Sequence, residues 1–348
     1  MMSQKPITIK DLAEQLNISV STVSRALKDN HEISEKTRKA VQDLAKKVGY
    51  KPNPIAVALK THKSYTIGVI VPQIVSTFFA TVVKTIEEVA DKYGYNVLVS
   101  SSNESFEKEM KSIDILLGTR ADGIILSLAH ETRTFDHIKN IQEAGIPVVL
   151  FDRTTDKFEI SRVVTDGLTA AFQAVQHLVE VGAKKIFILT GPKQITIGGN
   201  RMKGYLKAME SNHLEVKPHY VCYCEDYTVQ AGKKAVQQII AAKDIPEAIF
   251  GINDDLIIGA IEALKEAGLR IPEDVALVGF SNTKRSRYMS PTVSSINQFP
   301  EKIGKIAAEL LFEQILNNRH AKIREEIVNC ELIVRDSSNR KRQILHNN

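Results

Sequence analysis

Residues 7–63 read ITIKDLAEQLNISVSTVSRALKDNHEISEKTRKAVQDLAKKVGYKPNPIAVALKTHK, and the rest of the chain is organised around this stretch. The first 63 residues contain ten Lys and two Arg against three Asp and three Glu. They carry a net charge of +6, whereas the remainder of the chain is almost neutral. A basic segment on a neutral body is typical of a nucleic-acid-binding end, although solvated helix faces are also often basic.

Three short helices are predicted in this basic segment. Residues 8–11 fit a capping box that starts the first helix, and Ser19 or Ser21 can cap the second. Ser34 can cap a third helix, which Gly49 ends. Two helices joined by so tight a turn form a helix-turn-helix, whose second helix fits the major groove of DNA.

The predicted second helix leaves small and polar side chains on its exposed face. Small side chains let a helix approach base edges, hydroxyls can bond bases or phosphates, and an arginine can bond guanine through two hydrogen bonds. Alone, such a helix would be interpreted as merely solvated, but its neighbours and the basic charge favour DNA contact. The predicted contacts from this helix are Val20, Ser21, Thr22, Ser24, Arg25 and Lys28.

A short apolar helix is predicted directly after the three-helix unit, at residues 55–60. Asn53 can cap it, and Pro54 suits its first turn. A helix of under two turns is marginal in water. We therefore expect it to order only against a partner copy of the chain and a DNA minor groove.

Five motifs carry a resemblance to a known family: Thr8, the run Ser21-Thr22-Val23-Ser24-Arg25-Ala26-Leu27, Ser34-x-x-Thr37-Arg38, Gly49-Tyr50-x-Pro52-Asn53 and Ala56-x-x-Leu59. They resemble the headpiece and hinge of the lactose/galactose (LacI/GalR) repressor family. The resemblance implies paired hinge helices in the minor groove, where Leu59 wedges into a base step and Ala56 packs against the groove. It adds these to the predicted DNA contacts: Thr8, Ser34, Thr37, Tyr50, Asn53, Ala56 and Leu59.

The remainder of the chain is predicted to be a two-lobed α/β body. Strand and helix patterns alternate, and the strands are continuous apolar runs, which indicates parallel sheets covered on both faces. The alternation restarts after a crossing strand at 161–165, and the resemblance implies the type I periplasmic-binding-protein fold. We expect a helix-turn-helix headpiece at 1–50, a hinge helix and linker at 51–63, a first lobe at about 64–162 and 295–322, and a second lobe at about 163–294 and 323–348. A helix at 301–316 should return to the first lobe, and the segment 326–334 should end in the second.

Several classes of protein are disfavoured by what the sequence lacks. No uncharged apolar stretch of 18 residues and no signal core occur, so we expect a cytoplasmic protein without a membrane span. Cys222, Cys224 and Cys330 have no histidine pattern near them, so neither a metal nor another cofactor is expected. No Walker loop or nucleophile elbow is present, and Asp254 and Asp255 should diverge on a strand-to-helix turn, which disfavours an enzyme.

Polar and aromatic side chains follow the predicted strands, where open parallel sheets bind ligands. Carboxylates, amides and an arginine near an aromatic ring suit a molecule with many hydroxyls. The family resemblance implies a cleft Asp at Asp152, a cleft arginine at Arg201, an Asn-Asp pair at 253–254 and a stacking ring at Phe79. The predicted effector contacts are Ser76, Phe78, Phe79, Asp152, Arg201, Asn253, Asp254 and Ser281, with Gln73, Arg153 and Asn282 as further candidates.

Other interpretations of these residues remain open. Asp152 and Asp254 can serve as helix caps, and Arg201 can form a surface ion pair. Phe78 and Phe79 can be ordinary core, whereas Ser281 departs from the family pattern. The family usually has Asp at one or both of positions 281 and 282, so Ser281 and Asn282 remove a carboxylate that sugar hydroxyls would use.

Two functional classes are compatible with these features. The favoured one is a DNA-binding transcriptional regulator, a repressor, switched by a small-molecule effector such as a sugar or sugar derivative. The alternative is a solute-binding receptor with the same body, which would need export and has no use for a helix-turn-helix. We expect a homodimer on a pseudo-palindromic operator, because residues 335–348 lack the leucine heptads of a tetramerising coil. We favour induction over co-repression.

Overall fold

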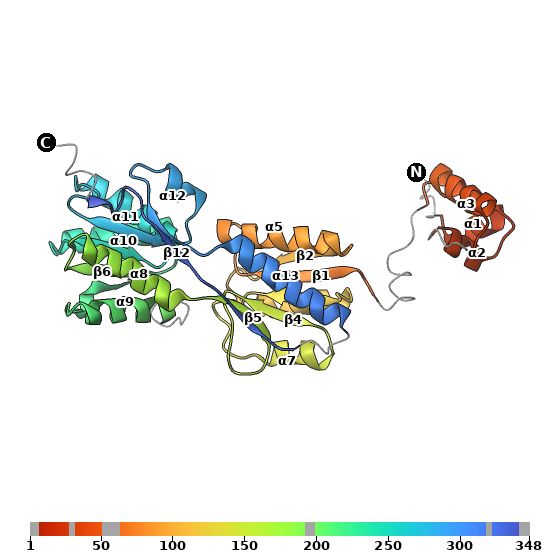
Figure 1. Cartoon of the computed structure of the whole chain (residues 1–348), viewed down its shortest axis with the longest axis horizontal. Helices are drawn as coiled ribbons and strands as arrows, with labels where there is room; N and C mark the ends of the chain where they lie inside the picture. Colours follow the sequence, from red (N-terminus) through yellow and green to blue (C-terminus); the bar gives the residue numbers. More distant parts are fainter. Residues whose placement is uncertain (1–6, 28–31, 51–62, 192–198, 318–321, 341–348) are drawn as a thin grey trace. The chain divides into compact units, whose positions relative to one another are not determined.

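The computed structural model describes residues 7–27, 32–50, 63–191, 199–317 and 322–340 (Figure 1). The chain divides into two compact units, Met1–Tyr65 and Thr66–Asn348, and each is described by itself. The hinge helix expected at 55–60 lies outside the described residues. So do four of the predicted DNA contacts: Lys28, Asn53, Ala56 and Leu59.

The first unit contains three helices, α1 (Ile9–Gln15), α2 (Val20–Ala26) and α3 (Glu35–Val48). The expected capping box is present at the start of α1, and Ser19 rather than Ser21 caps α2. Ser34 caps α3, and Gly49 ends it with a left-handed φ of 67°. The helices share a small core in which Leu12, Val23, Ala26 and Val41 are fully buried. Three short helices therefore suffice for an independent hydrophobic centre.

The first lobe of the second unit is built on a parallel six-stranded sheet in the order β11-β5-β4-β3-β1-β2. Its strands are β1 (Thr66–Val71), β2 (Asn96–Ser101), β3 (Gly123–Leu126), β4 (Val148–Phe151), β5 (Ser161–Thr165) and β11 (Glu325–Val328). Its helices are α5 (Thr77–Lys92), α6 (Phe106–Gly118), α7 (Asp136–Glu143) and α13 (Pro300–Leu316).

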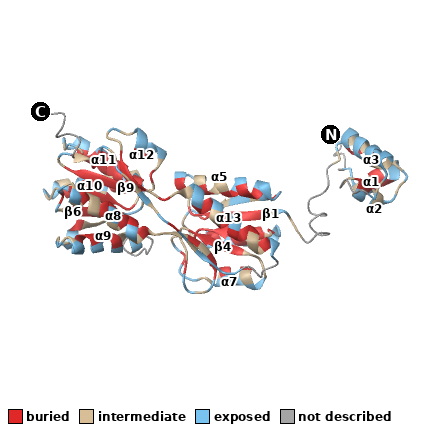
Figure 2. Cartoon of the chain, viewed as in Figure 1, coloured by how far each residue is buried: buried red, intermediate tan, exposed pale blue. Residues whose placement is uncertain are grey.

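Side chains along these strands alternate between two hydrophobic clusters, one on each face of the sheet. On β1, Ile67 and Val69 belong to the cluster under α5 and α13, whereas Ile70 belongs to the cluster under α6 and α7. Gly68 allows α6 to approach, because a Cβ there would lie 2.2 Å from Leu116 Cδ1. Figure 2 shows the buried strands between partly exposed helices, as expected for a sheet covered on both sides.

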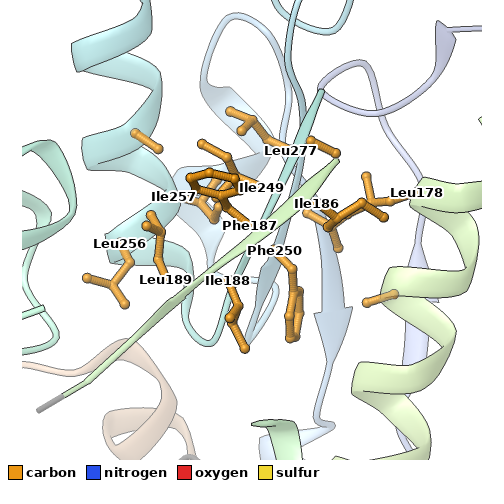
Figure 3. Packing of buried hydrophobic residues seen from close by; sticks show 14 of the residues in the cluster. Leu178, Ile186, Phe187, Ile188, Leu189, Ile249, Phe250, Leu256, Ile257 and Leu277 are labelled. Atoms are coloured by element: carbon orange, nitrogen blue, oxygen red, sulfur yellow. The ribbon is translucent and has the colours of Figure 1, made fainter. Parts of the chain in front are cut away.

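The second lobe has a six-stranded sheet in the order β12-β10-β9-β8-β6-β7, in which only the β10–β12 pair is antiparallel. Its strands are β6 (Ile186–Thr190), β7 (Val221–Tyr223), β8 (Ala248–Gly251), β9 (Ala276–Phe280), β10 (Ser294–Asn297) and β12 (Glu331–Ile333). Its helices are α8 (Gly167–Glu180), α9 (Gly199–Ser211), the 3₁₀ turn η2 (Pro218–Tyr220), α10 (Val229–Ala241), α11 (Asp254–Glu266) and α12 (Lys284–Tyr288). Figure 3 shows Phe187 and Phe250 from neighbouring strands in the core of this lobe.

The chain passes between the two sheets three times, and the crossings differ from the expected boundaries. β5 lies in the first sheet, so the first lobe extends to Thr165 rather than 162, and β10 keeps the second lobe running to Asn297 rather than 294. The segment expected at 326–334 in the second lobe contains two strands, β11 and β12. β11 pairs with β5 in the first sheet, so its assignment to the second lobe was wrong. Apolar periodicity continues through Asn329 and Cys330 and gives no sign that the pairing partner changes there.

Candidate DNA-binding surface and candidate effector cleft

The exposed face of α2 is the first candidate site. Val23 and Ala26 are buried, which turns Val20, Ser21 and Arg25 outward, and Val20 is 41% exposed despite its apolar side chain. Thr22 and Ser24 are half-buried on the flanks of this face. The structure therefore presents the predicted side chains of this helix on one accessible surface.

Hydroxyl groups gather at the amino-terminal end of α2. Ser19 Oγ lies 2.7 Å from Ser21 Oγ and 2.8 Å from Thr22 Oγ1, and Thr22 N donates to Ser19 Oγ. The guanidinium of Arg25 lies 3.7 Å from the Glu32 carboxylate, and both side chains are more than half exposed. An exposed ion pair of this kind contributes little to stability, so Arg25 can exchange its contact with Glu32 for a contact with a phosphate or a base.

The other predicted contacts of this unit lie at helix ends. Thr8 donates from its hydroxyl to Asp11, and hydrogen bonds from Thr8 lower the pKa of Asp11. Ser34 Oγ lies 2.8 Å from Thr37 Oγ1 at the start of α3. Tyr50 packs against the core of the three helices, and burial raises the pKa of its phenol. Three of these contacts, Thr8, Ser34 and Thr37, thus sit at helix amino termini, which attract phosphate.

The second candidate site is a cavity of about 860 Å³ in the body, lined by residues of both lobes. Its walls are the segments that follow β1, β3, β4, β8 and β9, together with the start of α9 and the crossing after β10. All eight predicted effector contacts line it: Ser76, Phe78, Phe79, Asp152, Arg201, Asn253, Asp254 and Ser281. The structure therefore brings together residues that are up to about 200 positions apart in the sequence.

Arg201 is held in the cavity wall by contacts within the second lobe. Its Nη1 donates to the carbonyl oxygen of Ile252, and its guanidinium carbon lies 3.8 Å from the centroid of the Phe280 ring. Burial lowers the pKa of Arg201, and the charge of Asp152 opposes that shift. Arg201 lines the cavity and has no ion pair with any described residue, which contradicts the interpretation of Arg201 as one half of a surface ion pair.

Asp152 lines the same cavity from the first lobe. Its backbone has a left-handed φ of 56°, an uncommon conformation for a residue other than glycine, and such residues cluster at functional sites. Burial raises the pKa of the Asp152 carboxyl, whereas the charges of Arg153 and Arg201 lower it. No described residue donates a side-chain hydrogen bond to this carboxylate, which leaves it open to a ligand.

Asn253 and Asp254 line the same cavity but bind other parts of the protein. Asn253 Oδ1 accepts from Leu256 N to cap α11, and its Nδ2 donates to the Tyr227 carbonyl. Asp254 is 1% exposed, and its carboxylate accepts from Ser295 Oγ, from Thr283 N at 2.7 Å and from Ser286 Oγ at 3.0 Å. Asp254 therefore holds the loop after β9, whereas Asn253, rather than Asp254, caps α11.

The aromatic wall of the cavity is largely core. Phe78 and Phe79 are less than a tenth exposed and pack edge to face, with their centroids 5.1 Å apart. The guanidinium of Arg153 lies 5.8 Å from the Phe79 centroid, and Arg153 pairs with Glu104. Ser76 precedes α5, and its hydroxyl makes no capping hydrogen bond. The rings therefore support the wall, while the Ser76 hydroxyl is available to a ligand.

Gln298 also lines the cavity and was not predicted. It follows β10 at a crossing between the lobes, is 2% exposed, and its Oε1 accepts from Ser281 Oγ at 3.0 Å. Its Nε2 finds no hydrogen-bond partner among the described residues. Ser281 has a φ of 115°, so this hydrogen bond comes from a strained backbone position. The rule that polar residues at strand ends form the site would have found Gln298, had β10 been recognised as a strand.

The loop at 128–135 forms another unpredicted part of the wall. The fully buried Glu109 holds it, because its carboxylate accepts from Ala129 N and from Thr132 Oγ1 at 2.9 Å and lies 2.8 Å from His137 Nε2. No sequence motif marks this arrangement. It depends on a long-range contact between α6 and the segment after β3.

Among the described residues, no group of three His, Cys, Asp or Glu is arranged to hold a metal ion. Burial raises the pKa of Cys222 and Cys224 to about 12 and that of Cys330 to about 11. None of the helices in the described part of the chain is long and apolar enough to cross a membrane.

An exposed recognition helix and a two-lobed body around a polar cavity define a DNA-binding regulator with a ligand-binding domain. Residues 8–53 match the model of the bacterial regulatory proteins of the lacI family, and residues 64–336 match that of the periplasmic binding proteins and sugar-binding domain of the LacI family. The chain belongs to the lacI family of bacterial regulatory proteins. The predicted fold class and family are thereby confirmed.

Relatives and solved structures agree over nearly the whole chain. The transcriptional repressor CytR of Escherichia coli strain K12 is 34% identical over 331 residues, which cover 95% of this chain and 96% of CytR. Catabolite control protein A of Priestia megaterium is also 34% identical, over 88% of this chain and 91% of its own. The crystal structure of the lac repressor dimer bound to operator and an anti-inducer matches with a TM-score of 0.85 at 25% identity, over 96% of this chain and 99% of the repressor chain.

Proposed function

We propose that this chain is a transcriptional repressor whose affinity for operator DNA is controlled by a small molecule bound in the cavity of its body. One observation carries the proposal: residues of both lobes line one cavity in a chain that also exposes the α2 face. A solute-binding receptor is not favoured, because it would have no use for residues 8–53 and their lacI-family match.

The operator is proposed to be a pseudo-palindrome read by a homodimer. The first lobe leaves strand β2 at the edge of its sheet, with the apolar side chains of Leu98 and Val99 about 40% exposed. Nearby Ile74 is 56% exposed, and a small cavity of about 240 Å³ lies between it and Val99. Proteins usually cover an apolar sheet edge of this kind. A second copy of the chain would cover it and place two copies of α2 on neighbouring half-sites.

The ligand is proposed to act by changing how the lobes close. Asp152 and Phe79 belong to the first lobe and Arg201 to the second, so a ligand that touches all three favours one lobe angle. Such coupling acts in both directions: the ligand changes DNA affinity by the factor by which DNA changes ligand affinity, typically about 1–3 kcal/mol. We propose that the sign is induction, in which the ligand weakens operator binding.

A repressor acts where the chromosome is, so the proposed place of action is the bacterial cytoplasm. No catalytic role is proposed. Asp254 is engaged in the loop after β9, and Asp255 lies 3.6 Å from Arg285, so these neighbouring carboxylates do not face one common target.

The test selects operator sequences from random DNA with the full chain and then footprints the selected sites. We expect protection of two symmetric half-sites about one helical turn apart, with log affinity falling steeply as log salt rises. A single asymmetric half-site bound by a monomer would contradict the dimer. Binding with no preference among DNA sequences would contradict the proposal that the chain is a repressor.

A further inference from the structure

We propose that the effector carries a negatively charged group, so that it is a sugar acid or a sugar phosphate rather than a neutral sugar. This inference rests on the proposed function, because it takes the cavity of the body as the effector site. The inference is based on which charged side chains of the cavity lining already have a partner of opposite charge within the protein and which do not.

Most charged groups of the cavity have partners within the protein. Arg153 pairs with Glu104, and Arg285 lies near Asp255. Arg201 forms no ion pair with a described residue, but it shares the cavity lining with the Asp152 carboxylate, so their opposite charges offset each other there. These pairs leave little net charge for a ligand to meet.

Two cations of the cavity lining have no such partner. Arg133 and Lys203 both line the cavity, and neither forms an ion pair with a described residue. Arg133 donates through Nη1 to the carbonyl oxygens of His130 at 2.6 Å and Thr132 at 3.1 Å. Those bonds orient the guanidinium without neutralising it, and its other N–H groups stay available. The remaining carboxylate of the lining, Asp254, is buried and already accepts three hydrogen bonds.

The two cations come from opposite lobes. Arg133 follows β3 in the first lobe, and Lys203 lies on α9 in the second. Both side chains are exposed to solvent, so closure that brings these like charges nearer and removes them from water would be unfavourable. An anion between them would reverse the sign of that interaction. A switch requires a ligand that binds one lobe angle more tightly than the other. A charged effector can therefore act as a switch, because it would bind the closed cavity more tightly than the open one.

The segment after β9 contributes no compensating negative charge. Ser281 offers a hydroxyl that donates to Gln298, and Asn282 accepts from Arg335 at 2.6 Å through its Oδ1. Gln298 adds a donor, because its buried Nε2 has no partner in the described part of the chain and requires an acceptor atom. Oxygens of a carboxylate or phosphate only accept hydrogen bonds when ionised, which suits a lining with donors to spare.

The experiment measures thermal shifts and calorimetric binding of the full chain with matched ligands. The series comprises glucose, glucuronate, gluconate and glucose 6-phosphate, the corresponding galactose compounds, and uncharged nucleosides. We expect an acid or a phosphate to bind at least about tenfold more tightly than its neutral parent, since hydrogen bonds to charged groups are the stronger kind. Raising NaCl from 50 to 500 mM should weaken the binding of the acid and leave the binding of the neutral sugar unchanged.

Variants connect the preference to the two cations. Arg133→Gln and Lys203→Gln should each weaken binding of the charged ligand by about three- to tenfold, and the double variant should lose most of the discrimination. Lys207→Gln is the matched control, because Lys207 is an exposed lysine of α9 that does not line the cavity. Acid binding that is the same in both cation variants as in the control would overturn the proposal.

The remaining outcomes separate this inference from the proposed function. If a neutral sugar or nucleoside binds as well as any acid, and Arg201→Ala abolishes that binding, the effector cleft stands and the anionic ligand is wrong. If the full chain binds its selected operator but no acid or phosphate of the series binds, the anionic ligand is again contradicted. If an acid binds without changing operator affinity, the proposed switch fails and the anion site stands.

Discussion

Polar side chains led to the prediction of both the exposed face of α2 and the wall of the cavity. In the structure, however, these side chains have different surroundings in the two regions. On α2, burial of Val23 and Ala26 leaves the predicted side chains free in solvent. In the cavity wall, the polar atoms of Asn253 and Asp254 already form hydrogen bonds with neighbouring segments of the protein. Periodicity therefore suffices to predict which side chains of a helix are exposed, whereas the prediction of a cleft also requires knowing which polar atoms lack partners within the protein.

The largest expected effect tests the interpretation of Asp254 as a structural residue. Asp254→Ala should lower the free energy of unfolding by about 3 kcal/mol or more, because each buried donor left without an acceptor costs about 1–3 kcal/mol. Denaturant unfolding of the body measures this. Asp255→Ala is the control: Asp255 is half exposed and has a single long ion pair, so its loss should cost under about 1 kcal/mol. Equal costs would remove the distinction between the two carboxylates.

The next effect concerns Arg201, whose role we propose to be ligand binding. Arg201→Ala should weaken effector binding by about 2 kcal/mol or more, roughly thirtyfold, because it leaves the Asp152 carboxylate without its facing charge. Operator affinity without effector should be unchanged. Titration of the effector into protein–operator complexes measures both quantities. An unchanged effector response in this variant would remove Arg201 from the site.

On the recognition surface, Arg25→Ala should weaken operator binding by about 1–3 kcal/mol and relax the preference at one base pair of each half-site. The folded headpiece should persist, since the side chain is exposed and its contact with Glu32 is long. Lys47→Ala, at the end of α3, serves as the control for loss of charge alone. Fluorescence anisotropy with operator and scrambled DNA separates the two. Equal losses on both DNAs would make Arg25 a phosphate contact.

The smallest effect is the pH dependence of the empty cavity. Burial raises the folded-state pKa of Asp152, so the ionised carboxylate costs stability once the pH exceeds its unfolded value, and the full cost applies above the folded pKa. Asp152→Asn should therefore raise the melting temperature slightly at pH 7, and the difference should vanish near pH 3. Scanning calorimetry without ligand measures it. A variant less stable than the parent at pH 7 would mean that attraction to Arg201 outweighs burial.

The fold was largely accessible from sequence because its elements have strong local signals. Capping residues at Thr8, Ser19 and Ser34 and continuous apolar strands each act over a few positions. The partner of β11 was not accessible, since an alternating pattern fits either sheet edge. In the site, residue type placed Asp152 and Arg201 at the cavity, but Gln298 and the Glu109-bound loop depend on contacts between distant segments. Hydrogen-bond satisfaction is a property of the folded chain and has no local sequence signal.

The pairing of β11 and β12 has a consequence for how the protein is made. β11 completes the edge of the first sheet and β12 that of the second, although both lie within residues 325–333. Neither lobe can therefore complete its sheet until these residues have been synthesised, and both sheets still lack a strand while the ribosome is translating the preceding helix. By contrast, the three-helix unit at the amino terminus has its whole core within residues 9–50 and can fold long before. For the interval between these two events, a nascent chain carries a complete recognition helix without the body that would control it.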